Sequence, residues 1–111
     1  MKKLLVLPAA AMLAMGISTA SNAADMPPLA KKSGCTACHA IDKKVVGPAW
    51  GEVSKHYKGK DAKADLITKV KKGGKGNWTA VTKGVPMPPY SPRVADADIE
   101  KLVDFVLGIA K

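Results

Sequence analysis

The sequence is poor in the residues that usually stabilise a small domain. It has two cysteines, Cys35 and Cys38, and aromatic side chains make up only 5% of its 111 residues. A disulfide between cysteines so close together would close a very small loop and constrain the unfolded chain little. A short chain also buries only a limited core of its own. The sequence therefore predicts that a large apolar cofactor completes the core.

Arginine is almost absent, although the chain is basic. Arg93 is the single arginine among 18 Lys and Arg residues, which outweigh 9 Asp and Glu to give a net charge of +9. Nucleic-acid-binding surfaces usually combine arginine with aromatic side chains, so this composition argues against a nucleic-acid partner. A lysine-rich surface fits an acidic protein partner better.

Long hydrophobic runs are missing after the first two dozen residues. Residues 4–17 are almost all apolar, follow Lys2 and Lys3, and precede a stretch of small residues. This order is typical of a secretory signal peptide. The run is shorter than the ~20 residues of a membrane-spanning helix, which makes an uncleaved anchor the weaker alternative.

We expect residues 1–23 to be the signal peptide, with cleavage after Ala23 or Ala24, and residues 24–111 to form one exported domain. Removing Lys2 and Lys3 lowers its net charge to +7. The mature chain contains no further candidate membrane span, and we expect it to be a periplasmic monomer.

Alternation of apolar and polar residues, the signature of strands, is nowhere sustained. Helix signals are clearer. The sequence predicts four helices, starting near Pro28, at Pro48, after a cap at Asp61 that leads to Gly73, and after a cap at Asp96. Between residues 73 and 95 lies a loop without secondary structure, unusually long for a small domain and therefore a candidate for function.

Cys35-Thr36-Ala37-Cys38-His39 is the strongest chemical motif in the chain. Cys-x-x-Cys-His is typical of covalent haem attachment. Two thiols one turn apart can each add to a vinyl group on one edge of a porphyrin, and the following His is carried under the ring to bind iron.

Three other functions compete for this motif. A structural zinc site would need four ligands, which Cys35, Cys38, His39 and the distant His56 could supply. A thioredoxin-like pair would need a βαβ setting that is missing here. A plain disulfide would explain neither His39 nor the proline-rich loop.

A second axial iron ligand is available in that loop. Met87 is flanked by Pro86, Pro88 and Pro89, which stiffen the backbone and lower the entropy cost of holding its thioether in place. The other mature candidates are Met26, near the N-terminus, and His56, among charged residues. We expect Met87 to be the ligand.

Gly34 to Asp42, Val46-Gly47-Pro48-Ala49, Pro86 to Pro89 and a C-terminal amphipathic helix follow one another along the chain. In this order they resemble the short bacterial class I cytochromes c of the c-551/c-552 type. The resemblance covers the whole mature chain. It implies an all-α cytochrome c fold of four to five helices around one covalent haem c.

The resemblance also implies roles for individual residues. Cys35 and Cys38 would carry the thioethers, and His39 and Met87 would be the axial ligands. The Pro48 carbonyl would accept a hydrogen bond from His39, and Trp78 would hydrogen-bond a haem propionate. Contact between the first and last helices is implied as well, with Gly34 and Phe105 as candidates, while the stretch from Trp78 to Met87 is longer than the family pattern.

Iron with both axial positions filled has no free site for a substrate, so we expect an electron carrier and not an enzyme. Its partners would be redox proteins with acidic surfaces: a donor such as a quinol–cytochrome c reductase, and an acceptor such as a terminal oxidase or a nitrite or peroxide reductase. The alternative is a haem-based sensor or peroxidase-like protein with a displaceable Met87.

Overall fold

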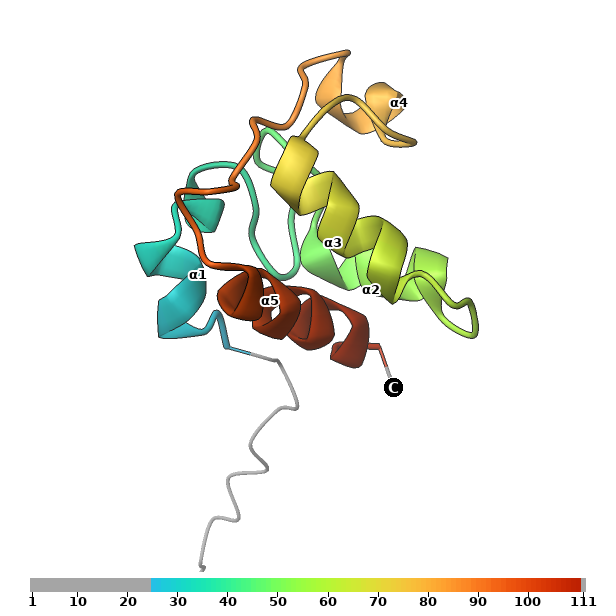
Figure 1. The fold of residues 1–111 in the computed structure, drawn as a ribbon. Helices are drawn as coiled ribbons and strands as arrows, with labels where there is room; N and C mark the ends of the chain where they lie inside the picture. The colour runs from blue at the N-terminus through green and yellow to red at the C-terminus, as the bar shows by residue number, and fades with distance from the viewer. Residues whose placement is uncertain (1–24, 111) are drawn as a thin grey trace, which may run out of the picture.

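The computed structural model describes residues 25–110, so the expected signal peptide lies outside the described residues. This part of the chain is helical, as predicted, and contains no strand. Its elements are α1 (Pro28–Lys32), a 3-10 turn η1 (Cys35–Ala37), α2 (Trp50–Tyr57), α3 (Lys63–Lys72), α4 (Thr79–Thr82) and α5 (Asp96–Gly108) (Figure 1). None of the helices within residues 25–110 is both long and apolar enough to cross a membrane.

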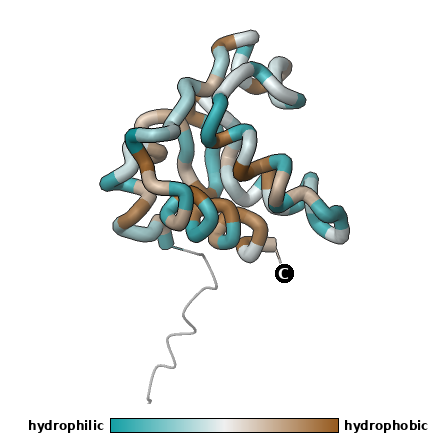
Figure 2. The backbone as a smooth tube through the Cα atoms, in the orientation of Figure 1, coloured by the Kyte–Doolittle hydropathy of each residue, from teal (hydrophilic) through white to brown (hydrophobic). Residues whose placement is uncertain are grey.

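Helix α5 is the element around which the others gather, because α1, α2 and α3 all pack against it. Its apolar residues recur every three or four positions, which places them on one face of a helix. The buried ones are Ile99, Leu102, Val103 and Val106. Figure 2 shows apolar and polar segments alternating along this helix. The confirmed contact between α1 and α5 matches the expectation for the first and last helices.

The buried side chains form two clusters that meet along α5. The first joins α1, η1 and α2 to one part of α5 and contains Ala30, Cys35, Trp50, Val53, Leu102 and Val106. The second joins the segment before α5 to other buried residues of α5 and contains Tyr90, Val94, Ile99 and Val103. Phe105, the other residue expected at the α1–α5 contact, is half-buried against the first cluster and packs edge-on against Trp50 of α2, with ring centroids 5.9 Å apart.

Gly34 does not make the close helix contact that was expected of it. A Cβ built on Gly34 meets no atom within 4 Å, so the glycine is not there to save space. Its φ of 85° lies in the left-handed region, where glycine has no steric penalty. Gly34 is therefore needed for the turn that leads from α1 into the two cysteines.

Two predicted helix caps, Asp61 and Asp96, are each wrong by one residue. The N-cap of α3 is Ala62 and that of α5 is Ala95, and neither helix has a side-chain cap. Asp96 instead lies in the first turn of α5, where its negative charge favours the helix dipole. The predicted end of α3 at Gly73 is confirmed, with a left-handed φ of 71°.

The segment between Gly73 and Ala95 is not structureless as predicted, because it contains the short helix α4. Figure 1 shows α4 beyond the end of α3, away from α5. A four-residue helix offers little periodicity to detect, and its composition, Thr-Ala-Val-Thr, has only a weak helical preference. This is why the sequence did not indicate it.

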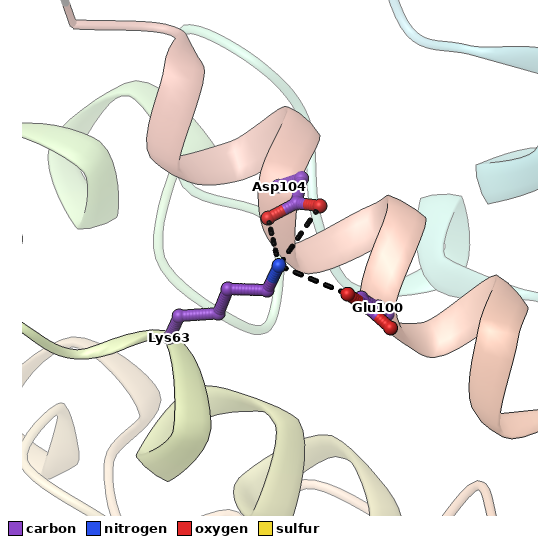
Figure 3. A network of polar contacts seen from close by, with 3 residues as sticks. All are labelled: Lys63, Glu100 and Asp104. Atoms are coloured by element: carbon purple, nitrogen blue, oxygen red, sulfur yellow. Dashed lines mark hydrogen bonds and ion pairs between the residues drawn. The ribbon is translucent and has the colours of Figure 1, made fainter.

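Helix α3 is joined to α5 by an exposed ion-pair network (Figure 3). The Lys63 ammonium lies 3.0 Å from a Glu100 oxygen and 3.0 Å from an Asp104 oxygen. These hydrogen bonds raise the pKa of Lys63, the bond to Glu100 most of all. The network links α5 to α3, whose inner face lines the site described next.

Candidate functional site

The cysteine motif folds into a tight turn immediately after α1. The Cys38 and His39 amides both donate to the Cys35 carbonyl, at 3.1 and 3.0 Å. Both cysteines are free thiols, so the disulfide alternative is not formed. Cys35 is buried and Cys38 is partly exposed. Burial raises the pKa of the Cys35 thiol above its ordinary value, which keeps it protonated.

His39 is held by the segment that follows the motif. Its ring Nδ1 lies 2.8 Å from the Pro48 carbonyl oxygen, so Nδ1–H donates and Nε2 is left free to bind a metal. This is the hydrogen bond that the resemblance implied. Burial lowers the pKa of His39, opposed by the bond to Pro48, and so favours the neutral imidazole that can act as a ligand.

Gly47 allows this arrangement because a larger residue would not fit. A Cβ built on Gly47 would lie 2.5 Å from the His39 Cε1 atom and 3.1 Å from Nε2. Real Cβ atoms do not approach other heavy atoms so closely. The chain at Gly47 therefore packs directly on the imidazole, and Trp50 lies 5.7 Å away, centroid to centroid.

Met87 is fixed to the end of α3 by a two-way backbone pair. The Gly74 amide donates to the Met87 carbonyl at 2.9 Å, and the Met87 amide donates to the Gly74 carbonyl at 3.0 Å. The close approach explains a second glycine, because a Cβ on Gly73 would collide with the Met87 carbonyl oxygen. The methionine position is thus tied to a helix end in addition to being stiffened by prolines.

Two adjoining cavities bring the motif and the methionine together. The first contains Cys35 and is lined mainly by apolar side chains of α2, α3 and α5; the second contains Cys38 and the proline-rich loop. Four residues line both: His39, Lys69, Trp78 and Met87.

These residues fit a covalently attached haem. The structure places a thiol in each cavity, an imidazole with a free Nε2, and a thioether from a different part of the chain. Apolar walls in the first cavity suit the porphyrin, and Lys69 on the shared wall suits its anionic propionates. His39 and Met87 are the axial candidates because both line the two cavities.

The zinc alternative finds no support in residues 25–110. No three His, Cys, Asp or Glu side chains of this part of the chain gather where they could hold a metal ion. His56, which that alternative required, is exposed and packs edge-on against Tyr57 and Trp78, with centroids 4.7 and 5.2 Å away. Trp78 itself is partly buried and lies directly before α4.

Sequence reasoning did not assign a role to Lys69, Thr82 or Tyr90, which also line the site. Their positions depend on how α3 and the loop fold over the cavity, and no local pattern reveals that. Gly47 belongs to the Val46-Gly47-Pro48-Ala49 motif, but the motif does not reveal its contact with His39.

Comparison with known proteins agrees with this geometry. The family model described as cytochrome c matches residues 23–110. The chain is 48% identical over 82 residues to cytochrome c-551 of Allochromatium vinosum, covering 73% of this chain and 82% of that protein. It is also 48% identical to cytochrome c-552 of Hydrogenobacter thermophilus, covering 73% and 78%.

A solved structure matches the fold as well. The crystal structure of wild-type Nitrosomonas europaea cytochrome c552 superposes with a TM-score of 0.65 at 41% identity, covering 73% of this chain and 95% of that one. Fold, free thiols, axial candidates and relatives agree. The chain therefore belongs to the cytochrome c family, as a class I monohaem member with covalently bound haem c that carries electrons.

Proposed function

We propose that the protein is a periplasmic single-electron carrier whose haem is attached through Cys35 and Cys38 and ligated by His39 and Met87. The observation that carries the proposal is that His39 and Met87, from distant parts of the chain, line the same two cavities. The bound haem iron supplies a one-electron couple, with a reduction potential raised by a methionine ligand relative to a second histidine.

The chain's own residues hold this couple in a fixed environment. Pro48 orients the His39 ring, Gly47 packs against it, and the Gly74–Met87 pair fixes the opposite loop. Because both sides are anchored in the backbone, a change of iron charge requires little rearrangement of the protein. This suits outer-sphere electron transfer better than substrate binding.

The ligand assignment is tested by two matched variants. Met87→Ala should lose the weak far-red absorbance band that methionine sulfur gives with ferric iron, while His56→Ala should keep it, because His56 packs on Trp78 outside the cavities. A band that survives Met87→Ala would reject Met87 as the ligand. Rapid binding of carbon monoxide to the reduced wild type would instead favour the sensor or peroxidase-like alternative.

The docking surface for redox partners is proposed at the rim of the second cavity. Val45, Val46 and Val85 are 43%, 40% and 50% exposed, the large exposed hydrophobic residues of the described chain. Val46 and Val85 line the cavity that contains Cys38. Exposed lysines flank them in sequence at Lys43, Lys44 and Lys83. An apolar patch beside cations fits a transient partner with an acidic rim.

This surface predicts a steep salt dependence. Electron exchange with an acidic redox protein should slow as ionic strength rises, because exposed charges are screened. Lys43→Glu/Lys44→Glu should slow the exchange at low salt, whereas Lys101→Glu, on the exposed side of α5, should change it much less. A flat salt profile, or equal effects of both variants, would reject the proposed surface.

Export remains part of the proposal. The amino-terminal pattern supports cleavage after Ala23 or Ala24, outside the described residues. The protein purified from the periplasm should start at Ala24 or Asp25 by N-terminal sequencing, and it should sediment as a monomer. An intact Met1 on membrane-bound protein would show an anchor instead.

A further inference from the structure

Met87 belongs to a segment that is bound to the end of α3 by four backbone hydrogen bonds. Two of them form the Gly74–Met87 pair, at 2.9 and 3.0 Å. In the next two, the Tyr90 amide donates to the Val70 carbonyl at 3.1 Å, and the following amide donates to the Lys71 carbonyl at 3.3 Å. The prolines around Met87 leave this segment little freedom of its own. A movement of α3 therefore carries Met87 with it.

Helix α3 is a wall of the site that contacts one other helix. Among the helices of residues 25–110, it packs only against α5. The contact is apolar, because Leu66, Ile67 and Val70 pack against the second buried cluster. Leu66 and Val70 also line the first cavity, together with Met87. Separation of α3 from α5 would thus open this cavity and withdraw the methionine in one movement.

Both ends of this contact carry an ion pair to α5. At the start of α3, Lys63 binds Glu100 and Asp104, as Figure 3 shows. At its end, the Lys71 ammonium lies 3.3 Å from an Asp96 carboxylate oxygen. These charges are at least partly exposed, so each pair shifts an equilibrium by at most about fivefold and is weakened by salt. The two lysines lie about 12 Å apart along the helix, at opposite ends of it.

We propose that residues 63–91 detach from α5 as one unit, and that Lys63 and Lys71 are positioning residues that keep this unit, and with it Met87, in place. This rests on the proposed ligation of the iron by Met87. Opening of the unit breaks the bond between iron and the Met87 sulfur, and a small neutral ligand such as imidazole can then bind the iron through nitrogen. His39 stays bound, because the carbonyl that orients it lies before α2, outside the unit.

Imidazole binding to the ferric, haem-loaded protein measures this opening, at a pH where imidazole is neutral. Lys71→Gln should bind imidazole about two- to fivefold more tightly than the wild type, the change expected from one exposed ion pair. Lys63→Gln should act in the same direction, although Lys63 lies at the far end of α3 from Met87. The matched control is Lys72→Gln, which should equal the wild type, because Lys72 is exposed in the same last turn and makes no ion pair within residues 25–110. Salt should tighten imidazole binding to the wild type and affect Lys63→Gln/Lys71→Gln less.

Hydrogen exchange tests whether α3 and Met87 open together. A helix of 10 residues is marginally stable once it is detached, so its amides exchange in the open state. In Lys71→Gln, the Val70 and Met87 amides should exchange faster than in the wild type by one common factor, and Lys72→Gln should change neither rate. The Val53 amide, which is bonded within α2, should exchange at the same rate in all variants.

Two results would overturn the proposal. Equal imidazole affinities in Lys63→Gln, Lys71→Gln and Lys72→Gln would mean that Met87 leaves the iron without any movement of α3. Faster exchange confined to the Met87 and Gly74 amides would show that the loop opens alone. A wild-type ferric protein without the far-red band would instead reject Met87 as the ligand and with it the proposed function, so the two failures are distinguishable.

Discussion

Gly47 packs so closely against the His39 ring that the orientation of the imidazole depends on position 47 having no side chain. The φ of Gly47 is not in the left-handed region, so alanine there would be free of backbone strain and would act only through its Cβ contact with the imidazole. We predict that Gly47→Ala displaces the His39 ring, perturbs the haem absorbance and lowers the free energy of unfolding by about 1–3 kcal/mol, the usual cost of overpacking. Absorbance spectra and guanidinium unfolding measure both effects.

Gly59→Ala separates ligand displacement from loss of stability. Gly59 has a φ of 77° and open space around a Cβ, so alanine there costs about 1–2 kcal/mol of backbone strain without touching the haem site. Its absorbance should remain that of the wild type. Equal spectra for both alanine variants would contradict the proposed role of Gly47.

Among individual residues, the sequence predicted those candidates for the site that a local motif identifies. Cys35, Cys38 and His39 form a contiguous motif, and Met87 stands out because prolines surround it. The contact of Gly47 with His39 and the backbone pair between Gly74 and Met87 arise from segments brought together by folding. No spacing in the sequence encodes such contacts.

The link between α3 and α5 predicts a pH-dependent contribution to stability. Because the bonds to Glu100 and Asp104 raise the pKa of Lys63 in the folded state, the folded chain holds this proton more tightly than the unfolded chain. The stabilisation is therefore fully present below the ordinary lysine pKa of about 10.4 and is lost as the pH rises through the folded value. Lys63→Met should be slightly less stable than the wild type at neutral pH.

The difference between Lys63→Met and the wild type should disappear above that window. Denaturant unfolding at neutral and strongly alkaline pH measures it, with Lys101→Met as an exposed control on α5. A difference that persists unchanged at alkaline pH would assign the effect to the aliphatic part of Lys63 and not to its charge.

A buried hydroxyl adds polar bonds to the apolar packing between α2 and the end of α5. Ser54 is 2% exposed. It accepts the Ala110 amide at 2.8 Å and donates to the Leu107 carbonyl at 3.2 Å. Ser54→Ala leaves both backbone groups without this partner and should lower the free energy of unfolding by about 1–3 kcal/mol. Thr68→Ala, at an exposed position of α3, should be close to neutral in the same guanidinium titration; a comparable loss there would contradict this explanation.

Helices could be predicted where the periodicity was long, and so could the end of α3 at Gly73, but the N-terminal caps of α3 and α5 could not. The apolar stripe of α5 identified it, but Asp61 and Asp96 are not caps, since Ala62 and Ala95 hold those positions. Lys63, the first residue of α3, instead pairs with α5. Local capping rules do not include such tertiary contacts, and α4 is too short to show a period at all.

For the whole molecule, the two core clusters meet along α5 with the cavities against them. A fold with so few aromatic residues depends on the cofactor to fill that space. We predict that Cys35→Ala/Cys38→Ala, which cannot attach haem, loses its near-ultraviolet circular dichroism and its cooperative unfolding transition. Both are measured on the purified chain.

His56→Ala is the control for this variant, since it should keep haem and unfold cooperatively. A cysteine-free chain that still unfolds in one sharp transition would mean that the protein side chains complete the core alone. The expectation drawn from the scarcity of aromatic residues would then be wrong.

The backbone pair between Gly74 and Met87 lets the segment between them vary in length. It closes residues 75–86 into a loop whose two ends lie side by side. Lengthening such a loop adds little to the entropic cost of closing it, about 0.6 kcal/mol for each doubling of its length. Insertions and deletions in this loop that spare the cavity-lining Trp78 can therefore accumulate without moving Met87 from the end of α3. Such length changes reshape the protein surface beside the cavity while the backbone pair that positions Met87 is kept.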